Sequence, residues 1–324
     1  MIDTFVFILH FLYVGEGDCT VVKYQYNGQT YLYCIDFGGN PSLIKRKTNV
    51  VKYLEKLGCK NKNNTHNDNN GSNNMLNDAH NNIKDTENNK VELNCILTHP
   101  HFDHYQYLEL LHQNFDIHKF YYSNLYEDYS KVNFTDKYLN TLRYNQKVRD
   151  VVGNIPQAQK QQVFSDDIIF QDKNICMQVL WPTQQYKDTN NDFNDNSMVI
   201  LITLQEKNKS VLLMADAGVK AEKEIMDKYP WLTNVDIVKI GHHGNNSSSS
   251  QDFIDKMNPK IVINSTGPHL LGCGLINCHI SSKIMKAWQK ARNGNTTIYT
   301  TYKHGDIMIT YDEKSNDFIL KQQC

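Results

Sequence analysis

The sequence predicts an α/β (α+β) protein with a four-layer αββα sandwich, in which two packed sheets carry helices on their outer faces. Two observations lead to this prediction. Both halves of the 324-residue chain contain several short apolar segments with the composition of strands. Segments with helical periodicity lie between them, in regular alternation in the second half. We expect a single domain over 1–324.

Each expected element follows from a local pattern. Apolar or alternating residues predict strands over 5–14, 20–26, 30–35, 93–97, 119–122, 168–170 and 176–180, and another at Val163. In the second half they predict strands over 198–204, 211–214, 235–240, 261–264, 297–301 and 307–311. Apolar residues on one helical face predict helices over 43–57, 105–111, 138–151, 220–228, 251–257 and 281–291.

Residues 61–89 differ in composition from the rest of the chain. They are mainly Asn, Asp, His and Lys, with almost no large apolar residues. Such a segment cannot bury enough surface to offset the entropy lost on ordering. We therefore expect a disordered insertion within the domain, with the fold closing across it.

The composition of the chain disfavours several classes of function. The formal net charge is -1, whereas proteins that grip long nucleic acids usually carry a basic excess, so a nuclease function is weakened without being excluded. No apolar stretch reaches the roughly 20 residues that span a bilayer. The eight cysteines include no pair with zinc-ribbon spacing. We expect a cytoplasmic protein with reduced thiols and no membrane span, and the sequence predicts no protein partner.

The strongest chemical signal is the segment 98–104, Thr-His-Pro-His-Phe-Asp-His, directly after an apolar strand. Imidazole and carboxylate groups bind zinc, manganese or iron in hydrolytic sites. A loop leaving a strand lets His99 and His101 face one metal ion, and the next helical turn directs Asp103 and His104 toward a second. The alternative, a chance cluster of surface histidines, is disfavoured by this spacing.

The motif His-x-His-x-Asp-His resembles the signature of the metallo-β-lactamase superfamily. Five further segments resemble one branch of it, the hydrolase domain of the bacterial competence DNA-uptake channel and its stand-alone relatives. They occur in the order of that branch, at 14–18, 34–39, 194–199, 212–217 and 239–244. The resemblance extends from the first strand to the last, apart from the insertion. It implies a metallo-β-lactamase-like fold.

The resemblance also implies two divalent metal ions, with zinc preferred and manganese as the alternative. Asp216 would bridge the two ions, and His242 would complete the second site. Spacing does not decide between His242 and His243; we prefer His242 as the ligand and expect His243 behind the ligands or against the substrate. The implied ligands are His99, His101, Asp103, His104, Asp216 and His242.

Other residues have expected roles near the metal ions. Asp103, His243 and His279 are the catalytic candidates, although His279 is equally explained as a surface residue before the last helix. Asp36 would orient ligands or serve as a turn residue. The serines at 247–250 would cap a helix and contact an anionic substrate.

One departure concerns the first metal site. Many superfamily members carry a further histidine before the bridging aspartate, but this chain has none between His118 and His242. Asn196 is the nearest polar candidate. The first site would therefore be more open, and occupancy by one ion is an alternative.

The expected reaction is hydrolysis by a metal-activated hydroxide, with Asp103 or an imidazole handling the proton. This apparatus acts on phosphodiesters, lactones, thioesters and β-lactams alike. The competence-type resemblance favours a phosphodiester, in nucleic acid or in a small phosphorylated substrate. The alternatives are an ester, lactone or β-lactam hydrolase, and a non-catalytic metal-binding module, which the intact ligand set disfavours.

Overall fold

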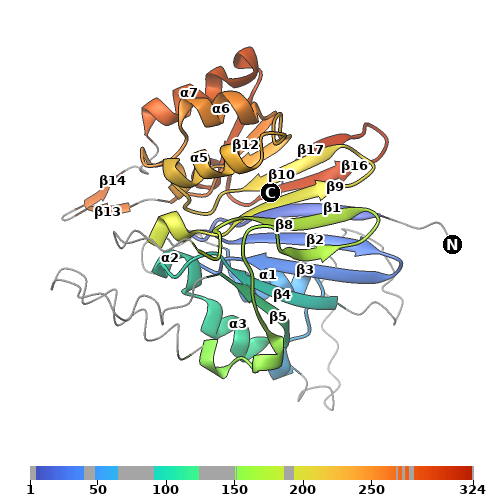
Figure 1. Cartoon of the computed structure of the whole chain (residues 1–324). Coiled ribbons are helices and arrows are strands. Elements are labelled where there is room, and N and C mark those ends of the chain that lie inside the picture. The colour runs from blue at the N-terminus through green and yellow to red at the C-terminus, as the bar shows by residue number, and fades with distance from the viewer. Residues whose placement is uncertain are drawn as a thin grey trace.

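The structure is a computed structural model that describes residues 5–39, 48–64, 91–123, 150, 152–185, 193–267, 269–271, 274–276 and 281–322. It confirms the four-layer sandwich (Figure 1). On the outer side of the first sheet lie α1 (Val50–Lys56), α2 (Phe102–Tyr105) and α3 (Leu108–Asn114). On the outer side of the second lie α5 (Val219–Lys228), α6 (Gln251–Met257) and α7 (Ser282–Gly294).

The first sheet has the strand order β17-β16-β1-β2-β3-β4-β5-β6. Strands β3 to β6 run parallel, and the pairs from β17 to β3 are antiparallel. The strands are β1 (Val6–Phe11), β2 (Thr20–Tyr26), β3 (Gln29–Ile35), β4 (Val91–Leu97), β5 (Ile117–Tyr122), β6 (Lys160–Gln162), β16 (Ile307–Asp312) and β17 (Asp317–Gln322).

The second sheet has the order β15-β12-β11-β10-β9-β8-β7. Strands β10, β11, β12 and β15 run parallel, and the others are antiparallel. The strands are β7 (Ile168–Gln171), β8 (Ile175–Trp181), β9 (Val199–Leu204), β10 (Lys209–Leu213), β11 (Ile237–Lys239), β12 (Ile261–Asn264) and β15 (Thr297–Thr300). A separate hairpin joins β13 (His269–Leu271) to β14 (Gly274–Ile276).

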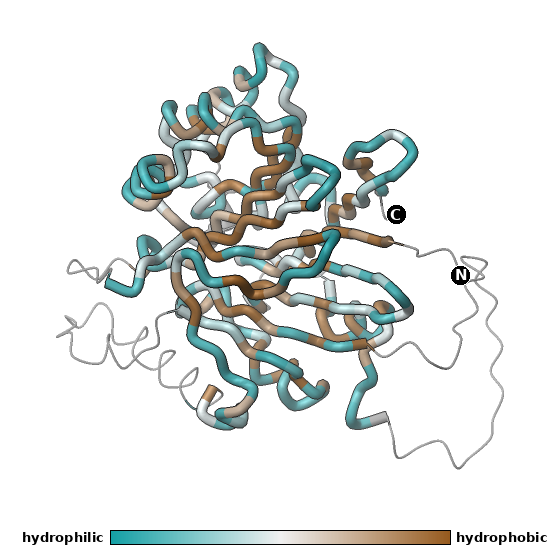
Figure 2. The backbone as a smooth tube through the Cα atoms, turned by 45° about the vertical axis from the view of Figure 1, so that its right-hand side comes forward, coloured by the Kyte–Doolittle hydropathy of each residue, from teal (hydrophilic) through white to brown (hydrophobic). Residues whose placement is uncertain are grey.

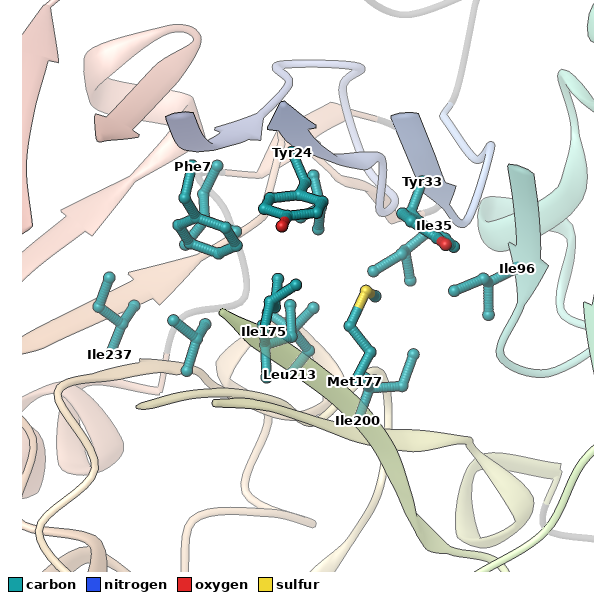
Figure 3. Close-up of a cluster of buried hydrophobic side chains, with 14 of the residues drawn as sticks. Phe7, Tyr24, Tyr33, Ile35, Ile96, Ile175, Met177, Ile200, Leu213 and Ile237 are labelled. Atoms are coloured by element: carbon teal, nitrogen blue, oxygen red, sulfur yellow. The ribbon is translucent and has the colours of Figure 1, made fainter. Parts of the chain in front are cut away.

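The main core lies between the two sheets. Alternate residues of each strand point inward, so that side chains such as Phe7 and Ile35 meet Met177, Ile200 and Leu213 from the opposite sheet (Figure 3). Hydrophobic residues accordingly follow the strands through the middle of the molecule (Figure 2). Burial of this kind contributes about 25 cal/mol per Å² of apolar surface and holds the two halves of the chain together.

Several elements differ from their predicted bounds. The helix expected over 105–111 is two short helices, because the backbone N–H of Tyr107 donates to the carbonyl of Phe37 instead of continuing α2. Helix α1 begins only at Val50, capped by the side chain of Asn49. Strand β17 was not predicted. Most of the helix expected over 138–151 lies outside the described residues.

The predicted insertion is only partly described. Residues 62–64 form a short 3-10 helix, and the side chain of Asn61 donates to Glu55 and Asn114. These residues therefore belong to the ordered fold, and the expected start of the insertion was too early. Residues 65–89 lie outside the described part. Among the helices described, none is both long and apolar enough to cross a membrane.

A buried histidine on β1 generates a prediction about acid stability. His10 lies 2.8 Å from the Tyr53 hydroxyl, and burial, followed by the charge of Lys23, lowers its pKa from 6.5 to about 3. Between pH 6.5 and 3 the unfolded chain binds a proton that the folded chain does not. This residue therefore lowers the free energy of unfolding by about 1.4 kcal/mol per pH unit as the pH falls through that window.

The variant His10→Gln should remove the part of the pH dependence of stability that comes from His10. Denaturant unfolding at pH 7 and pH 4 should show a smaller loss of stability in the variant than in the unaltered protein. Equal losses in the two proteins would show that His10 takes up its proton in the folded state.

Candidate metal centre

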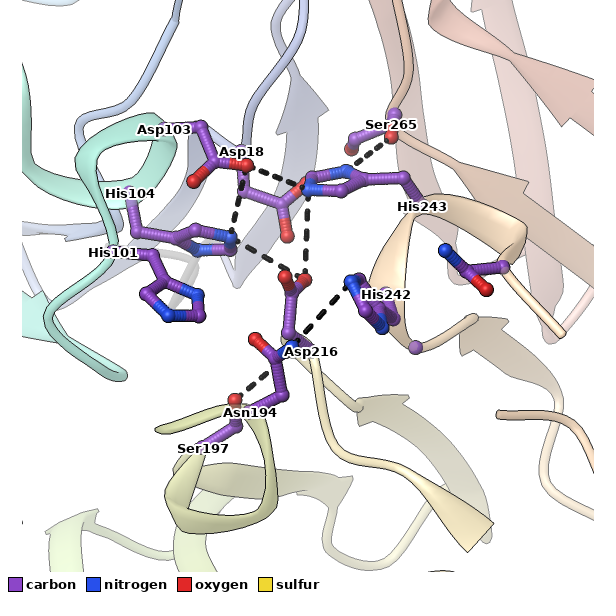
Figure 4. A network of polar contacts seen from close by, with 12 residues as sticks. Asp18, His101, Asp103, His104, Asn194, Ser197, Asp216, His242, His243 and Ser265 are labelled. Carbon is purple, nitrogen blue, oxygen red and sulfur yellow. Dashed lines mark hydrogen bonds and ion pairs between the residues drawn. The ribbon is translucent and has the colours of Figure 1, made fainter. Parts of the chain in front are cut away.

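The candidate ligands meet at one edge of the sandwich, where parallel strands of both sheets end. Asp36 follows β3, the segment 98–104 follows β4, and Asp216 follows β10. His243 lies in a short 3-10 turn, η5 (His242–Gly244), after β11. Figure 4 shows Asp216 with His104 and His243 on either side of its carboxylate. Segments distant in sequence thus converge as the motif predicted.

His99, His101 and Asp216 form a first ligand group, whose candidate ligand atoms all lie within 4.8 Å of one another. Nε2 of His99 is 3.1 Å from Nδ1 of His101 and 3.8 Å from Oδ2 of Asp216. The pKa of His99 lies well below its usual value, mainly because the ring is buried and secondly because His104 and His101 are close to it. The neutral imidazole is the form that binds a metal ion.

Asp103, His104, Asp216 and His243 form a second ligand group. Nδ1 of His104 donates to Oδ2 of Asp36 at 2.8 Å, which leaves Nε2 directed at Oδ1 of Asp216, 3.3 Å away. Nδ1 of His243 donates to the carbonyl of Ser265 at 2.8 Å, which leaves Nε2 3.1 Å from Asp103 Oδ2 and 3.6 Å from Asp216 Oδ1. Each of these imidazoles thus directs its Nε2 at the carboxylates.

The second ligand group is rich in negative charge. Burial alone would lower the pKa of His243, but Asp216, Asp103 and Asp18 outweigh it and raise that pKa to about 10. The pKa of His104 is raised in the same way by Asp216, Asp36 and Asp103. In the metal-free chain, protons on these two imidazoles therefore balance the carboxylates.

The residues fit a divalent ion. Nε2 of His104 and Oδ1 of Asp216 are buried, and neither makes a well-formed hydrogen bond within the described residues. Buried polar atoms without such partners are costly, and a cation held between them would remove the cost. The carboxylate of Asp216 is shared by both ligand groups, as expected of a bridging ligand.

Asp36 makes the contacts of an orienting residue. Its carboxylate accepts hydrogen bonds from the backbone N–H of Thr98 at 2.9 Å and from the hydroxyl of Thr98 at 2.8 Å, besides that from His104. The following turn packs directly on the loop that carries Asp103: a Cβ at Gly38 would lie 1.3 Å from the carbonyl oxygen of Asp103. Only glycine fits at this position.

The structure brings His243, and not His242, into the second ligand group, while the expected ligand role of His242 stays a prediction. Nδ1 of His242 lies 2.5 Å from the Ser247 hydroxyl, and its Nε2 is 3.5 Å from Nδ2 of Asn194. Both histidines have left-handed backbones, with φ of 45° and 51°. This tight turn carries the second ring inward and leaves the first at the rim.

Other predicted residues have mixed outcomes. Ser250 caps α6 through its side chain, as expected of the serine run. Asn196 is buried at the end of a 3-10 helix, η4 (Phe193–Asn196). His279 lies outside the described residues. No role was predicted for Ser197, although it lies in the segment 194–199 of the resemblance; its hydroxyl accepts from the backbone N–H of Asp216 at 3.2 Å. Asp18 and Lys239 likewise lie in the segments 14–18 and 239–244, but their contacts, described below, were not predicted.

No family model matches the chain. The chain is similar to ComE operon protein 3 of Bacillus subtilis (strain 168), with 28% identity over 130 residues, 36% of this chain and 16% of that protein. It is also similar to Recombination protein 2 of Haemophilus influenzae, with 33% identity over 73 residues, 22% of this chain and 9% of that protein. The competence-type resemblance is confirmed. The chain matches only a small part of the length of these relatives.

Among solved structures, the metallo-β-lactamase fold protein YhfI from Bacillus subtilis is similar to this chain. The similarity covers 94% of this chain and 99% of YhfI, with 10% sequence identity and a TM-score of 0.45.

The two adjacent histidines give a direct test of the second ligand group. His243→Ala should weaken binding of the second zinc ion by about tenfold or more, because it removes a candidate ligand. The matched variant His242→Ala should keep both ions. Zinc titration by calorimetry with elemental analysis measures both. The reverse pattern would return the ligand role to His242.

Metal affinity should rise with pH. The raised pKa values of His104 and His243 mean that these groups carry protons at neutral pH and must release them to bind a metal ion, so affinity increases as the pH rises toward about 10. Zinc titrations in buffers of different ionisation enthalpy measure the protons released. Binding without proton release would show that the two imidazoles remain protonated.

Proposed function

We propose that this chain is a metal-dependent hydrolase that cleaves phosphodiester bonds, in nucleic acid or in a small phosphorylated molecule. The observation that carries the proposal is the sharing of Asp216 between two ligand groups at one edge of the sandwich. Two divalent ions bound there, zinc or alternatively manganese, would ionise a water molecule and stabilise the charge that develops on the phosphate.

The protein's own groups would divide the remaining tasks. The side chain of Asp216 is 2% exposed and lies at the bottom of the site, whereas that of Asp103 is 30% exposed. Asp103 is therefore the more accessible of the two carboxylates, and it or a neighbouring imidazole would accept the proton that the reacting water loses. His243, hydrogen-bonded to Asp103 Oδ2, fixes the direction of that carboxylate.

The choice of a phosphodiester rests on the relatives. One is named a recombination protein and another, from Neisseria gonorrhoeae, a competence protein. These names favour nucleic acid among the substrates that such a metal centre can hydrolyse. The net charge of -1 favours short or single-stranded substrates over long duplexes gripped along their backbone.

A substrate panel tests the proposed reaction. The purified protein, loaded with zinc or manganese, should release p-nitrophenol from bis(p-nitrophenyl) phosphate and should cleave single-stranded DNA. Turnover of a lactone alone would replace this proposal with a lactonase. A protein without bound metal and without activity on any of the three would instead be a non-catalytic module.

The shared carboxylate should be indispensable for turnover. Asp216→Asn should lower kcat/KM by a factor of about 10³ or more, about 4 kcal/mol in activation free energy, while circular dichroism remains that of the folded protein. The control Asp255→Asn changes an exposed carboxylate on α6 that accepts from Gln251. It should leave kcat/KM unchanged. Full activity of Asp216→Asn would refute the bridging role.

A further inference from the structure

An ion pair is buried directly behind the second ligand group. Lys239, the last residue of β11, contacts the carboxylate of Asp18 from the loop between β1 and β2. The two side chains are only 3% and 2% exposed. The residues come from opposite sheets, so the contact crosses the sandwich at the edge that carries the ligands.

The backbone of Asp18 is fixed to the loop that carries Asp103. Its N–H donates to the carbonyl of Asp103 at 3.1 Å, and its carbonyl accepts from the N–H of Gly38 at 2.9 Å. The preceding residue, Gly17, packs so closely that a Cβ there would lie 2.4 Å from the same Asp103 oxygen. A displacement of Asp18 would therefore displace Asp103.

The other end of the ion pair is fixed to the ligands of the second sheet. The carbonyl of Lys239 accepts from the N–H of Met214 at 3.2 Å, two residues before Asp216. Lys239 also begins the short segment that leads to His243. The carboxylate of Asp18 reaches that ring as well, with Oδ1 3.7 Å from Nδ1 of His243 (Figure 4).

A buried ion pair is weak evidence for added stability. Removing both charges from water costs several kcal/mol, and apolar residues of similar volume often replace such a pair without loss. The carboxylates of Asp18 and Asp36 and the ring of His104 bring ligand atoms within 4.8 Å of one another. The ammonium of Lys239 supplies a fixed positive charge to this inner group.

We propose that Asp18 and Lys239 are a positioning pair, which joins the two halves of the second ligand group and sets the spacing between Asp103 and His243. Neither residue contacts the reacting atoms. The affinity of the second metal ion depends on the pair more than that of the first, because Asp103 and His243 belong only to the second ligand group, whereas His99 and His101 make no hydrogen bond or ion pair with either member of the pair within the described part of the chain. This inference rests on the metal centre proposed above.

Zinc titrations of the whole chain test the pair. Lys239→Met and Asp18→Asn should each weaken the second zinc ion by about tenfold or more, while the first ion changes by less than about threefold. The double variant should be no weaker than the weaker single variant, because either substitution already removes the interaction. The absorption bands of bound Co²⁺ should change for the second ion only.

Lys209→Met is the matched control. Lys209 is 12% exposed, pairs with Asp236 and Asp317, and begins β10, whose other end leads to Asp216. Its loss should lower the thermal stability without changing the affinity of either ion. If Lys239→Met does not fold, the test rests on Asp18→Asn, because asparagine preserves the shape of the aspartate side chain.

Two results would overturn the proposal: wild-type affinity for the second ion in both single variants, or losses that add in the double variant. Unchanged binding of two ions by these variants would leave the proposed hydrolase intact. A wild-type protein that binds fewer than two ions would overturn both the positioning pair and the dinuclear hydrolase.

Discussion

The site depends on one electrostatic constraint: buried carboxylates crowd one edge of the sandwich and must be matched by positive charge. Asp103 and Asp216 belong to the ligand groups, and Asp18 and Asp36 lie beside His104 in an adjoining cluster. Lys239 forms an ion pair with one of them, and the raised pKa values of His104 and His243 allow protons on these rings to balance others. Because uncompensated charge in an interior is very costly, the edge that carries the candidate ligands would be poorly stable without such positive charges.

The geometry of this edge also stores backbone strain. Asp36, Ala215, His242 and His243 all have positive φ, although none is glycine. Each such residue costs of order 1–3 kcal/mol and persists only where the surrounding structure imposes it. Here the surroundings are rigid parallel strands, β3 and β4 on one side and β10 and β11 on the other, with a packed core between the sheets. The packing of the core thus offsets the free-energy cost of the strained residues at the site.

The sequence predicted the sandwich and most of its strands because period-two and apolar patterns are local signals. It also predicted the convergence of the 99–104 loop with Asp216, since the motif and its order carry that information. It could not separate His242 from His243, because two left-handed residues in succession decide which ring points inward. The break between α2 and α3 and the contact of Asp18 with Lys239 depend on partners distant in sequence, which leave no local pattern.

The strand order has a consequence for how the chain is made. Strand β1 lies between β2 and β16, so one of its edges is paired only by a strand much later in the sequence. The histidines at 99, 101 and 104 likewise leave the ribosome long before their partners from β10 and β11. During synthesis, the open edge of β1 and the partners of the 99–104 loop are therefore both completed only by segments much later in the sequence.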